Sequence, residues 1–376
     1  MNKIKTDFLV VGSGFYGSVI AERIASILKK KVLILERRNH IGGNCYSEYD
    51  KSTNIEYHKY GSHIFHTSNK KVWDYINSFT KFNSYKHQVL TNFKNKIYQM
   101  PINLETINSF FNKNLSPHEA EKYINKISKK YYKNKYDNFE EKALSQIGLE
   151  LYSAFIKNYT EKHWDTNPKN LPASIFNRLP LRFNYNEDYF KNCIWQGIPK
   201  DGYTKIFKRL IDNKNIRLKK ESYNLNKDYD VKYMTIYTGP LDRLFNYKLG
   251  KLKWRSLLFK KKIVNVNDYQ GTSVINFPEK KFRFTRIHEP KHLHPERKFK
   301  NGKTLIIYEY PKTSDNEPYY PVNDEANRLR HRQYKKMAYK IPKFEIGGRL
   351  ADYAYYDMDM TISAALQKFE SIKKNI

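Results

Sequence analysis

The chain has 376 residues, of which 40% are hydrophobic and 15% aromatic, so it can bury a large core and does not have the composition of a disordered chain. Its formal net charge of +31 favours anionic partners such as nucleic acid, an anionic membrane or phosphorylated small molecules. The lysines are spread along the whole chain without a basic tail, so residue usage on solvated faces explains the charge better than a dedicated anion-binding surface does.

The N-terminal segment predicts a βαβ unit. Residues 6–11 are an apolar run that ends at a glycine, residues 18–28 have the pattern of an amphipathic helix, and residues 32–35 are a second short apolar strand. Two buried strands around a helix indicate parallel pairing with a right-handed crossover. Lys3 and Lys5 before an apolar run also resemble a signal peptide, but the glycines that follow and the lack of a cleavage pattern argue against one.

Between the first strand and helix lies a GxGxxG motif, residues 12–17. Gly12 permits the tight turn, Gly14 lets the backbone approach a pyrophosphate, and Gly17 lets helix and strand pack closely. The helix N-terminus adds free N–H groups and a partial positive charge. Glu36, at the end of the second strand, is placed to accept hydrogen bonds from a ribose. The motif in this context favours a dinucleotide over the alternative, a glycine-rich turn without a ligand.

The segment 36–46 favours FAD over NAD as that dinucleotide. The glycine pair at 42–43 follows soon after the acidic residue, as is usual where an FAD chain extends past its pyrophosphate. NAD domains normally continue directly into their next helix.

Beyond about residue 100 the predicted structure is helical and then β-rich. The sequence Ser116-Pro117-His118-Glu119 is typical of a capping box, and Asn138 with Glu141 predicts another helix start, so residues 105–160 are expected to be mainly helical. One face of the second helix would carry apolar side chains at Leu144, Ile147, Leu151 and Phe155. Segments 271–277 and 304–310 are expected to be antiparallel strands.

A βα pattern returns near residues 230–240 and 344–349, with a last helix from about Thr361, so the nucleotide-binding unit is discontinuous. The predicted fold class is α/β, with a Rossmann-like FAD-binding domain, a helical domain and an antiparallel β-sheet domain. The expected boundaries are 1–82, 198–246 and 343–376 for the FAD-binding domain, 100–175 for the helical substrate domain with the start of a mobile lid, and 83–99, 176–197 and 247–342 for the sheet domain.

Several segments resemble the UDP-galactopyranose mutases of the bacterial type, and the likeness runs essentially end to end. They are GSGFYG (12–17), RNHIGGN (38–44), YGSHIFHTS (60–68), PINLETINSFF (101–111), NYTEKHW (158–164), LPASIFNRLPLRFNY (171–185), QGIPKDGYT (196–204), YTGPLD (237–242), EPYYP (317–321), GGRL (347–350) and DMDMTI (357–362). The chain departs from the family at Ser62, where these enzymes often carry Pro or Ala, and at Ala351-Asp352 and Ala354, which are often Gly-Thr and Arg.

The resemblance implies isomerisation of UDP-galactopyranose to UDP-galactofuranose without net redox change, with N5 of the reduced flavin as the nucleophile at the anomeric carbon. The sequence leaves open whether an N-acetylated UDP-galactose is also converted. The alternative is a conventional FAD-dependent oxidoreductase. A third interpretation, a nucleic-acid-binding protein, rests on charge alone, and we expect no nucleic-acid partner. We expect a homodimer and an external reductant such as NAD(P)H.

Three residues match catalytic positions of the family. His63 would lie against the flavin near N5, where a near-neutral pKa would suit handling of the N5 proton. Arg178 and Arg286 would pair with the leaving diphosphate, because a planar guanidinium pairs with phosphate oxygens in a bidentate manner. Arg178 would ride on a mobile lid formed by residues 167–182. The alternatives are a structural histidine and surface arginines.

The other matched residues bind substrate or cofactor. The substrate set is Phe155, Tyr159, Thr160, Trp164, Tyr189, Asn276, Tyr320 and Tyr355. Phe155 and Tyr159 share a helix face and would stack on uracil, although core packing is the alternative for this pair. The cofactor set is Gly12, Gly14, Phe15, Gly17, Glu36, Arg37, Gly43, Asn44, His63, Gly239, Arg349, Asp357 and Met358, and no metal ligands are expected.

The sequence also bears on the compartment. The two cysteines, Cys45 and Cys193, form neither a disulfide framework nor a metal-binding pair, and the chain has no run of about 18 apolar residues. We therefore expect a cytoplasmic protein without a transmembrane helix.

Overall fold

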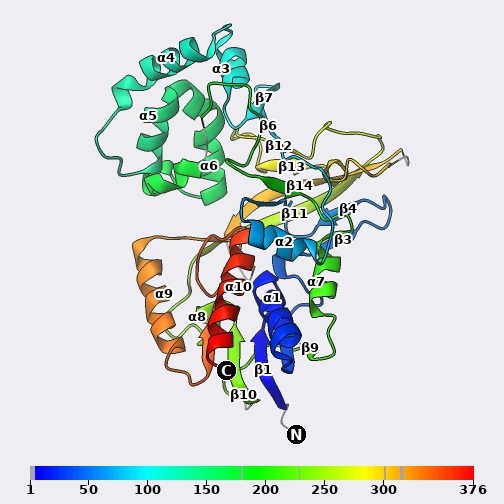
Figure 1. The fold of residues 1–376 in the computed structure, drawn as a ribbon. Helices are drawn as coiled ribbons and strands as arrows, with labels where there is room; N and C mark the ends of the chain where they lie inside the picture. Colours follow the sequence, from blue (N-terminus) through cyan, green and yellow to red (C-terminus); the bar gives the residue numbers. More distant parts are fainter. Residues whose placement is uncertain (1–4, 179–180, 228, 300–301, 314–316) are drawn as a thin grey trace.

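The computed structural model describes residues 5–178, 181–227, 229–299, 302–313 and 317–376, with Asn177 and Arg178 described by their backbone alone. These residues form a parallel sheet with its helices, a larger second sheet and a helical unit. The larger sheet lies between the other two parts (Figure 1).

The first sheet has five parallel strands in the order β16, β10, β1, β2, β9. The strands are β1 Lys5–Val11, β2 Val32–Glu36, β9 Ile216–Lys220, β10 Asp230–Tyr237 and β16 Phe344–Ile346. Successive side chains of a strand point to opposite faces. In β1, Phe8 and Val10 therefore pack into the core on one face, and Leu9 and Val11 pack into the core on the other.

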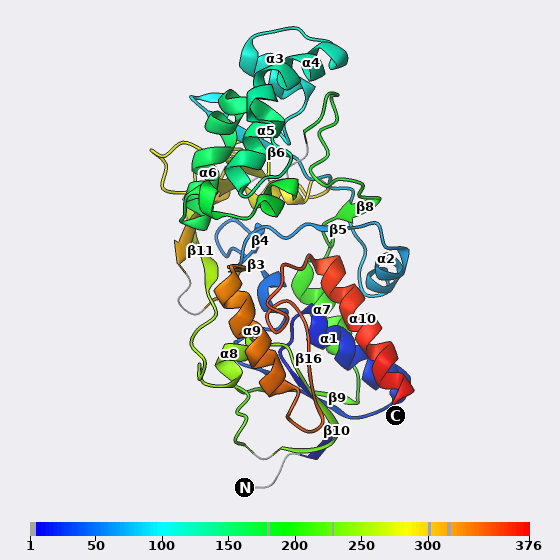
Figure 2. The same ribbon diagram turned by 90° about the vertical axis from the view of Figure 1, so that its left-hand side faces the viewer.

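Helices cover both faces of this sheet and make a three-layer α/β unit. The Phe8 face packs against α1 Phe15–Arg23 with its π-helical continuation Ile24–Leu28, α2 Lys70–Asn77, α7 Tyr203–Ile211 and α10 Met358–Lys374. The Leu9 face packs against α8 Leu241–Leu244 and α9 Glu325–Ala338. Figure 2 shows α9 and α10 on opposite sides of the strands. The last helix, α10, begins at Met358, three residues before the predicted start at about Thr361.

The second sheet has seven strands in the order β15, β11, β14, β13, β12, β6, β7. They are β6 Val89–Phe93, β7 Lys96–Met100, β11 Trp254–Val264, β12 Val274–Asn276, β13 Arg286–His288, β14 Thr304–Thr313 and β15 Tyr320–Pro321. Neighbouring strands are antiparallel, as predicted, except β6 and β12, which are parallel. These two strands are far apart in the chain, so no hairpin turn imposes an antiparallel direction on them.

The helical unit contains α3 Leu104–Phe111, α4 Pro117–Ser128, α5 Phe139–Leu151 and α6 Lys157–Trp164, with a π-helical segment at Tyr152–Ile156 and short 3-10 turns at Lys129–Tyr131, Pro168–Asn170 and Ala173–Arg178. Both predicted helix starts are confirmed: Ser116 and Glu119 form a capping box, and the Asn138 side chain accepts from the amide of Glu141 at 3.0 Å. Gly148, with φ of 74°, interrupts α5, so the predicted apolar face is not one continuous helix.

Two small ribbons connect the larger parts: β3 Ser47–Tyr49 pairs with β4 Glu56–His58, and β5 Phe65–Thr67 pairs with β8 Trp195–Gly197. Short 3-10 turns lie at Gly43–Cys45 and Pro290–Leu293. Among the helices that the structure describes, none combines the length and the apolar character that a membrane span requires.

Candidate active site

The turn between β1 and α1 places three glycines at the carboxyl end of the parallel sheet. A Cβ at Gly12 would lie 2.3 Å from Oγ1 of Thr238, and one at Gly17 would lie 2.0 Å from the carbonyl oxygen of Gly12. Gly14, the N-cap of α1, differs because a Cβ there would meet no described atom within 4 Å. The first turn of α1 therefore faces open space, where its N–H groups can bind a phosphate anion.

Glu36, at the end of β2, holds this turn through hydrogen bonds. Its carboxylate accepts from the amide and hydroxyl of Ser13, at 3.0 and 2.6 Å, and from the amide of Arg38 at 2.9 Å. A carboxylate has about four acceptor sites, so these bonds leave capacity for a further donor. The predicted contact of Glu36 with a ribose is compatible with this arrangement and stays a prediction.

A cavity of about 490 Å³ extends from the glycine turn to the side chains of the seven-stranded sheet. Most of the predicted site residues line it: Gly12, Gly14, Phe15, Gly17, Glu36, Arg37, Gly43, Asn44, His63, Tyr189, Gly239, Arg286, Tyr320, Arg349, Tyr355, Asp357 and Met358. The cavity thus joins the predicted cofactor-binding residues of the α/β unit with Arg286 and Tyr320 of the second sheet. Its volume is in the range of small-molecule sites in proteins.

His63 lines this cavity in the loop before β5. Its Nδ1 lies 2.7 Å from the carbonyl oxygen of Gly61, which can only accept, so Nδ1 carries the proton and Nε2 remains an acceptor. Burial lowers the pKa of His63 to about 4. This corrects the near-neutral pKa suggested by the sequence, because burial disfavours the charged form of the imidazole.

Arg286 is held at the cavity wall by its two neighbouring strands. Its Nε donates to Oδ1 of Asn276 in β12 at 3.3 Å, and its Nη1 donates to Oε1 of Glu309 in β14 at 3.2 Å. Its guanidinium carbon lies 5.7 Å from the ring centroid of Tyr159. The pairing with Glu309 fixes the guanidinium in place before any anion arrives, which is the preorganisation that a diphosphate site needs.

Five predicted substrate-binding residues are not part of the cavity lining: Phe155, Tyr159, Thr160, Trp164 and Asn276. Phe155 lies in the helical core, with its ring 5.1 Å from that of Tyr98, and Asn276 supports Arg286. Tyr159 lies beside Arg286, and its buried hydroxyl has no hydrogen-bond partner within the part of the chain that the structure describes. The packing alternative thus accounts for Phe155, and the uracil contacts of this group stay predictions.

The predicted lid, residues 167–182, contains two of the short 3-10 turns. Phe176 is buried with its ring 5.4 Å from Phe139, which anchors the second turn to the helical unit. Arg178 ends that turn, and its side chain lies outside the described part of the structure, as do residues 179–180. The catalytic role of Arg178 and the motion of the lid therefore stay predictions.

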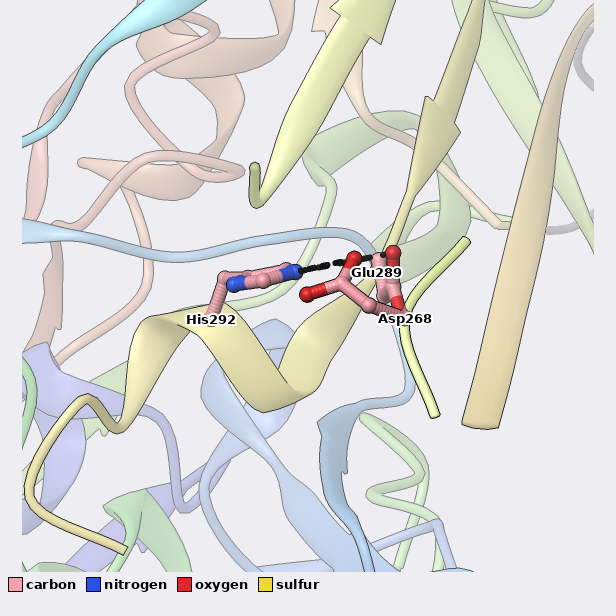
Figure 3. A group of neighbouring side chains, drawn as sticks. All are labelled: Asp268, Glu289 and His292. Carbon is pink, nitrogen blue, oxygen red and sulfur yellow. Dashed lines mark hydrogen bonds and ion pairs between the residues drawn. The ribbon is translucent and has the colours of Figure 1, made fainter. Parts of the chain in front are cut away.

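A second cluster of polar side chains, away from the cavity lining, consists of Asp268, Glu289 and His292 (Figure 3). Such a trio can in principle hold a metal ion. Here Glu289 accepts from the amide of Gln270 at 2.9 Å and from Oγ1 of Thr304 at 2.6 Å. The ammonium of Lys291 lies 3.2 Å from Asp268 and 3.4 Å from Glu289. This lysine already supplies positive charge to the carboxylates, which argues against a cation there.

Among the buried residues of the cavity wall that the sequence analysis missed are His288 and Glu309. Glu309 had a usable signal, because it shares a strand face with Leu305 and Ile307, and a carboxylate on a buried face needs a partner. His288 had no signal in its local sequence, because its partners come from other parts of the chain.

Together, the three-layer α/β unit, its glycine turn and the attached sheet define a dinucleotide-binding enzyme of the Rossmann-like class. Residues 10–79 match the model of the NAD(P)-binding Rossmann-like domain, and residues 154–355 match that of UDP-galactopyranose mutase. The chain belongs to the UDP-galactopyranose mutase family and is an isomerase.

Relatives along the whole chain support this membership. The chain is 37% identical to the dTDP-fucopyranose mutase of Escherichia coli, covering 100% of this chain and 99% of that protein. It is 37% identical to a probable UDP-galactopyranose mutase of Klebsiella pneumoniae, covering 98% and 95%. A crystal structure of reduced UDP-galactopyranose mutase shares the fold with a TM-score of 0.77 at 13% identity, covering 99% and 96% of the two chains. A putrescine oxidase shares it less closely, with a TM-score of 0.59 at 8% identity over 99% and 100%.

Proposed function

We propose that this protein converts UDP-galactopyranose to UDP-galactofuranose with FAD as its cofactor. The observation that supports this best is that Arg286, preorganised by Glu309, shares one cavity with the glycine turn, in a chain of the mutase family. A diphosphate at Arg286 and a dinucleotide at Gly14 would thus meet in the same space.

The residues of the cavity fit FAD. The start of α1 and Gly14 leave room for a pyrophosphate, Gly43 packs against the backbone of Gly14, and Asn44, Arg349 and Met358 line the same cavity. In its reduced form the bound flavin would supply N5 as a nucleophile toward the anomeric carbon. We propose that an external reductant such as NAD(P)H maintains that form and that the protein is a homodimer.

The side chains of this chain would bind and orient the substrate. Arg286 would hold the diphosphate and stabilise the negative charge that builds up as the diphosphate separates from the sugar. Tyr189, Tyr320 and Tyr355 would donate hydroxyl hydrogen bonds to the same group. His63, neutral with Nε2 as acceptor, would accept a hydrogen bond within the cavity.

A second candidate substrate is dTDP-fucopyranose, because the Escherichia coli relative named for it is 37% identical over the whole chain. Both substrates carry a pyrimidine nucleoside diphosphate on a hexopyranose, so one arginine clamp suits both. They differ in the base, in the 2′-hydroxyl and at C6 of the sugar. A conversion of UDP-N-acetylgalactopyranose would require further room in the same cavity.

The direct test is turnover by the FAD-loaded protein with UDP-galactopyranose, UDP-N-acetylgalactopyranose and dTDP-fucopyranose, followed by chromatography. After reduction with dithionite we expect conversion of UDP-galactopyranose without consumption of further reductant, and no conversion by the oxidised protein. Stoichiometric bleaching of the oxidised flavin by any of these sugars would instead establish a conventional FAD-dependent oxidoreductase.

A further inference from the structure

Ser62, His288 and Glu309 form a hydrogen-bonded chain along the cavity wall. Oγ of Ser62 lies 3.0 Å from Nδ1 of His288, and Nε2 of His288 lies 3.0 Å from Oε2 of Glu309. All three residues line the cavity, and His288 and Glu309 are almost completely buried. They come from the loop before β5, from β13 and from β14, and the mechanism above uses neither Ser62 nor His288.

The partners determine where the neutral imidazole carries its proton. Although burial alone would raise it, the Arg286 guanidinium and His288 hold the pKa of Glu309 well below its usual range, so this carboxylate is ionised and can only accept. His288 must therefore donate to it from Nε2. Nδ1 of the neutral ring then holds a lone pair, and the hydroxyl of Ser62 is the donor to that atom.

Protonation of the ring reverses the bond to Ser62. A protonated His288 donates from both nitrogens, so Oγ of Ser62 becomes the acceptor from Nδ1. The hydroxyl hydrogen of Ser62 then no longer bonds to His288 and can point into the cavity. At the same time the wall gains one positive charge next to Arg286.

We propose that His288 and Ser62 form a pH-dependent binding element for the diphosphate of the nucleotide sugar, in which protonation of His288 frees the Ser62 hydroxyl to donate a hydrogen bond to the diphosphate. The element deepens the proposed function and rests on it for the identity of the ligand. The family often carries Pro or Ala where this chain has Ser62. Neither residue has a hydroxyl, so neither can form this chain.

Several other titratable and charged groups lie around His288. The other histidines that line the cavity or lie near His288 and Glu309 are His58, His63, His66, His87 and His163, and burial lowers the pKa of His163 to about 4. Burial also lowers the pKa of the others, to about 3 for His58 and His87 and to about 4 for His63. Arg286 and Glu309 keep their charges. The variant His288→Gln therefore decides whether a change in affinity with pH comes from His288.

The test is calorimetric binding of UDP-galactopyranose and dTDP-fucopyranose to the oxidised, FAD-loaded protein at constant ionic strength from about pH 8 to about pH 5.5. Their phosphates are diesters, so the ligands do not titrate in this range. Because one positive charge is added beside the diphosphate, we expect roughly threefold to tenfold tighter binding at the lower pH. His288→Gln should abolish this change and Ser62→Ala should reduce it. The control His292→Gln, which removes a histidine outside the cavity lining, should leave it intact.

A second readout does not depend on the ligand. Nitrogen-15 NMR of labelled histidine, assigned with His288→Gln, should show the neutral ring of His288 protonated at Nε2. A ring protonated at Nδ1, or a pH dependence that survives His288→Gln, would overturn the element. Constant affinity over the pH range would overturn the element alone, whereas failure of both sugars to bind at any pH would overturn the proposed function as well.

The order hydroxyl, imidazole, carboxylate is also that of hydrolytic triads. If Ser62 binds the diphosphate and does not act as a nucleophile, treatment of the same protein with a fluorophosphonate should leave Ser62 unlabelled. Covalent labelling of Ser62 would assign a nucleophile and overturn the binding role.

Discussion

Two tyrosines of the helical unit, Tyr152 and Tyr159, differ in one hydrogen bond. The hydroxyl of Tyr152 donates to Oε2 of Glu140 at 2.7 Å, whereas that of Tyr159 has no partner among the atoms described. A buried polar group without a partner costs about 1–3 kcal/mol, so its removal should not destabilise the protein. We expect Tyr159→Phe to leave the free energy of unfolding unchanged or to raise it by about 1 kcal/mol, and Tyr152→Phe to lower it by about 1–2 kcal/mol.

The same pair tests whether Tyr159 meets the ligand. If the Tyr159 hydroxyl forms a hydrogen bond with the nucleotide, Tyr159→Phe should weaken UDP binding severalfold. Tyr152→Phe should leave UDP binding unchanged. Denaturant unfolding and calorimetry provide the two measurements. Equal UDP affinity in both variants would show that the Tyr159 hydroxyl does not meet this ligand.

The substitution Arg286→Lys tests whether the geometry of the anion site matters in addition to its charge. Lysine keeps the positive charge but loses the planar fork that bonds Asn276 and Glu309. We expect Arg286→Lys to lower turnover by about 10²-fold or more, because charge separation is largest in the transition state. FAD content should be unchanged. Arg209→Lys, an exposed arginine paired with Asp201, is the matched control, and normal turnover by Arg286→Lys would remove Arg286 from the mechanism.

At the scale of elements, Lys162 connects α6 to the loop between β12 and β13. Its ammonium lies within 3.1 Å of four backbone carbonyls of that loop, those of Phe277, Glu279, Phe282 and Phe284. One cation thus links the helical unit to the sheet that carries Arg286 through four hydrogen bonds. Hydrogen bonds from a charged donor contribute about 1.5–3 kcal/mol each, although several on one group do not add.

We therefore expect Lys162→Met to lower the free energy of unfolding by about 2–3 kcal/mol, measured by denaturant titration. The control is Lys280→Met in the same loop, whose exposed ammonium pairs with Glu161 at 2.9 Å. A surface ion pair contributes at most about 1 kcal/mol. Similar losses in the two variants would contradict the role assigned to the carbonyl cage.

At the scale of the whole molecule, substitutions at two glycines of one turn should affect protein stability and cofactor binding separately. Gly17 packs so closely on Gly12 that a Cβ has no space, whereas Gly14 faces open space. Gly17→Ala should therefore destabilise the apoprotein. Gly14→Ala should leave the apoprotein as stable as the wild type but reduce FAD affinity, because the new Cβ occupies the position that a pyrophosphate approaches.

Thermal unfolding with and without FAD measures both effects. FAD at about one hundred times its Kd should stabilise the wild type by about 2.7 kcal/mol and Gly14→Ala by less. The absence of any FAD-dependent shift in the wild type would contradict the proposed cofactor. An apoprotein destabilised equally by both substitutions would contradict the assigned difference between the two glycines.

Features that depend on neighbours in the chain could be predicted from the sequence alone. The glycine turn, the Ser116 capping box and the Asn138 cap each form within a few residues, so local geometry and hydrogen bonding specify them. The strands β1 and β2 and the discontinuous α/β unit followed from the apolar pattern for the same reason. The family resemblance added the residues of the cavity, most of which the fold brings together.

What the sequence could not decide depends on contacts between distant segments. Phe155 has the spacing of a binding residue, yet it packs against Tyr98 in the helical core, and β6 pairs in parallel with β12 from far along the chain. The chain of Ser62, His288 and Glu309 joins three separate segments, and no local pattern marks it. Polar residues acquire a role through the partners that burial imposes on them, and only the tertiary structure determines those partners.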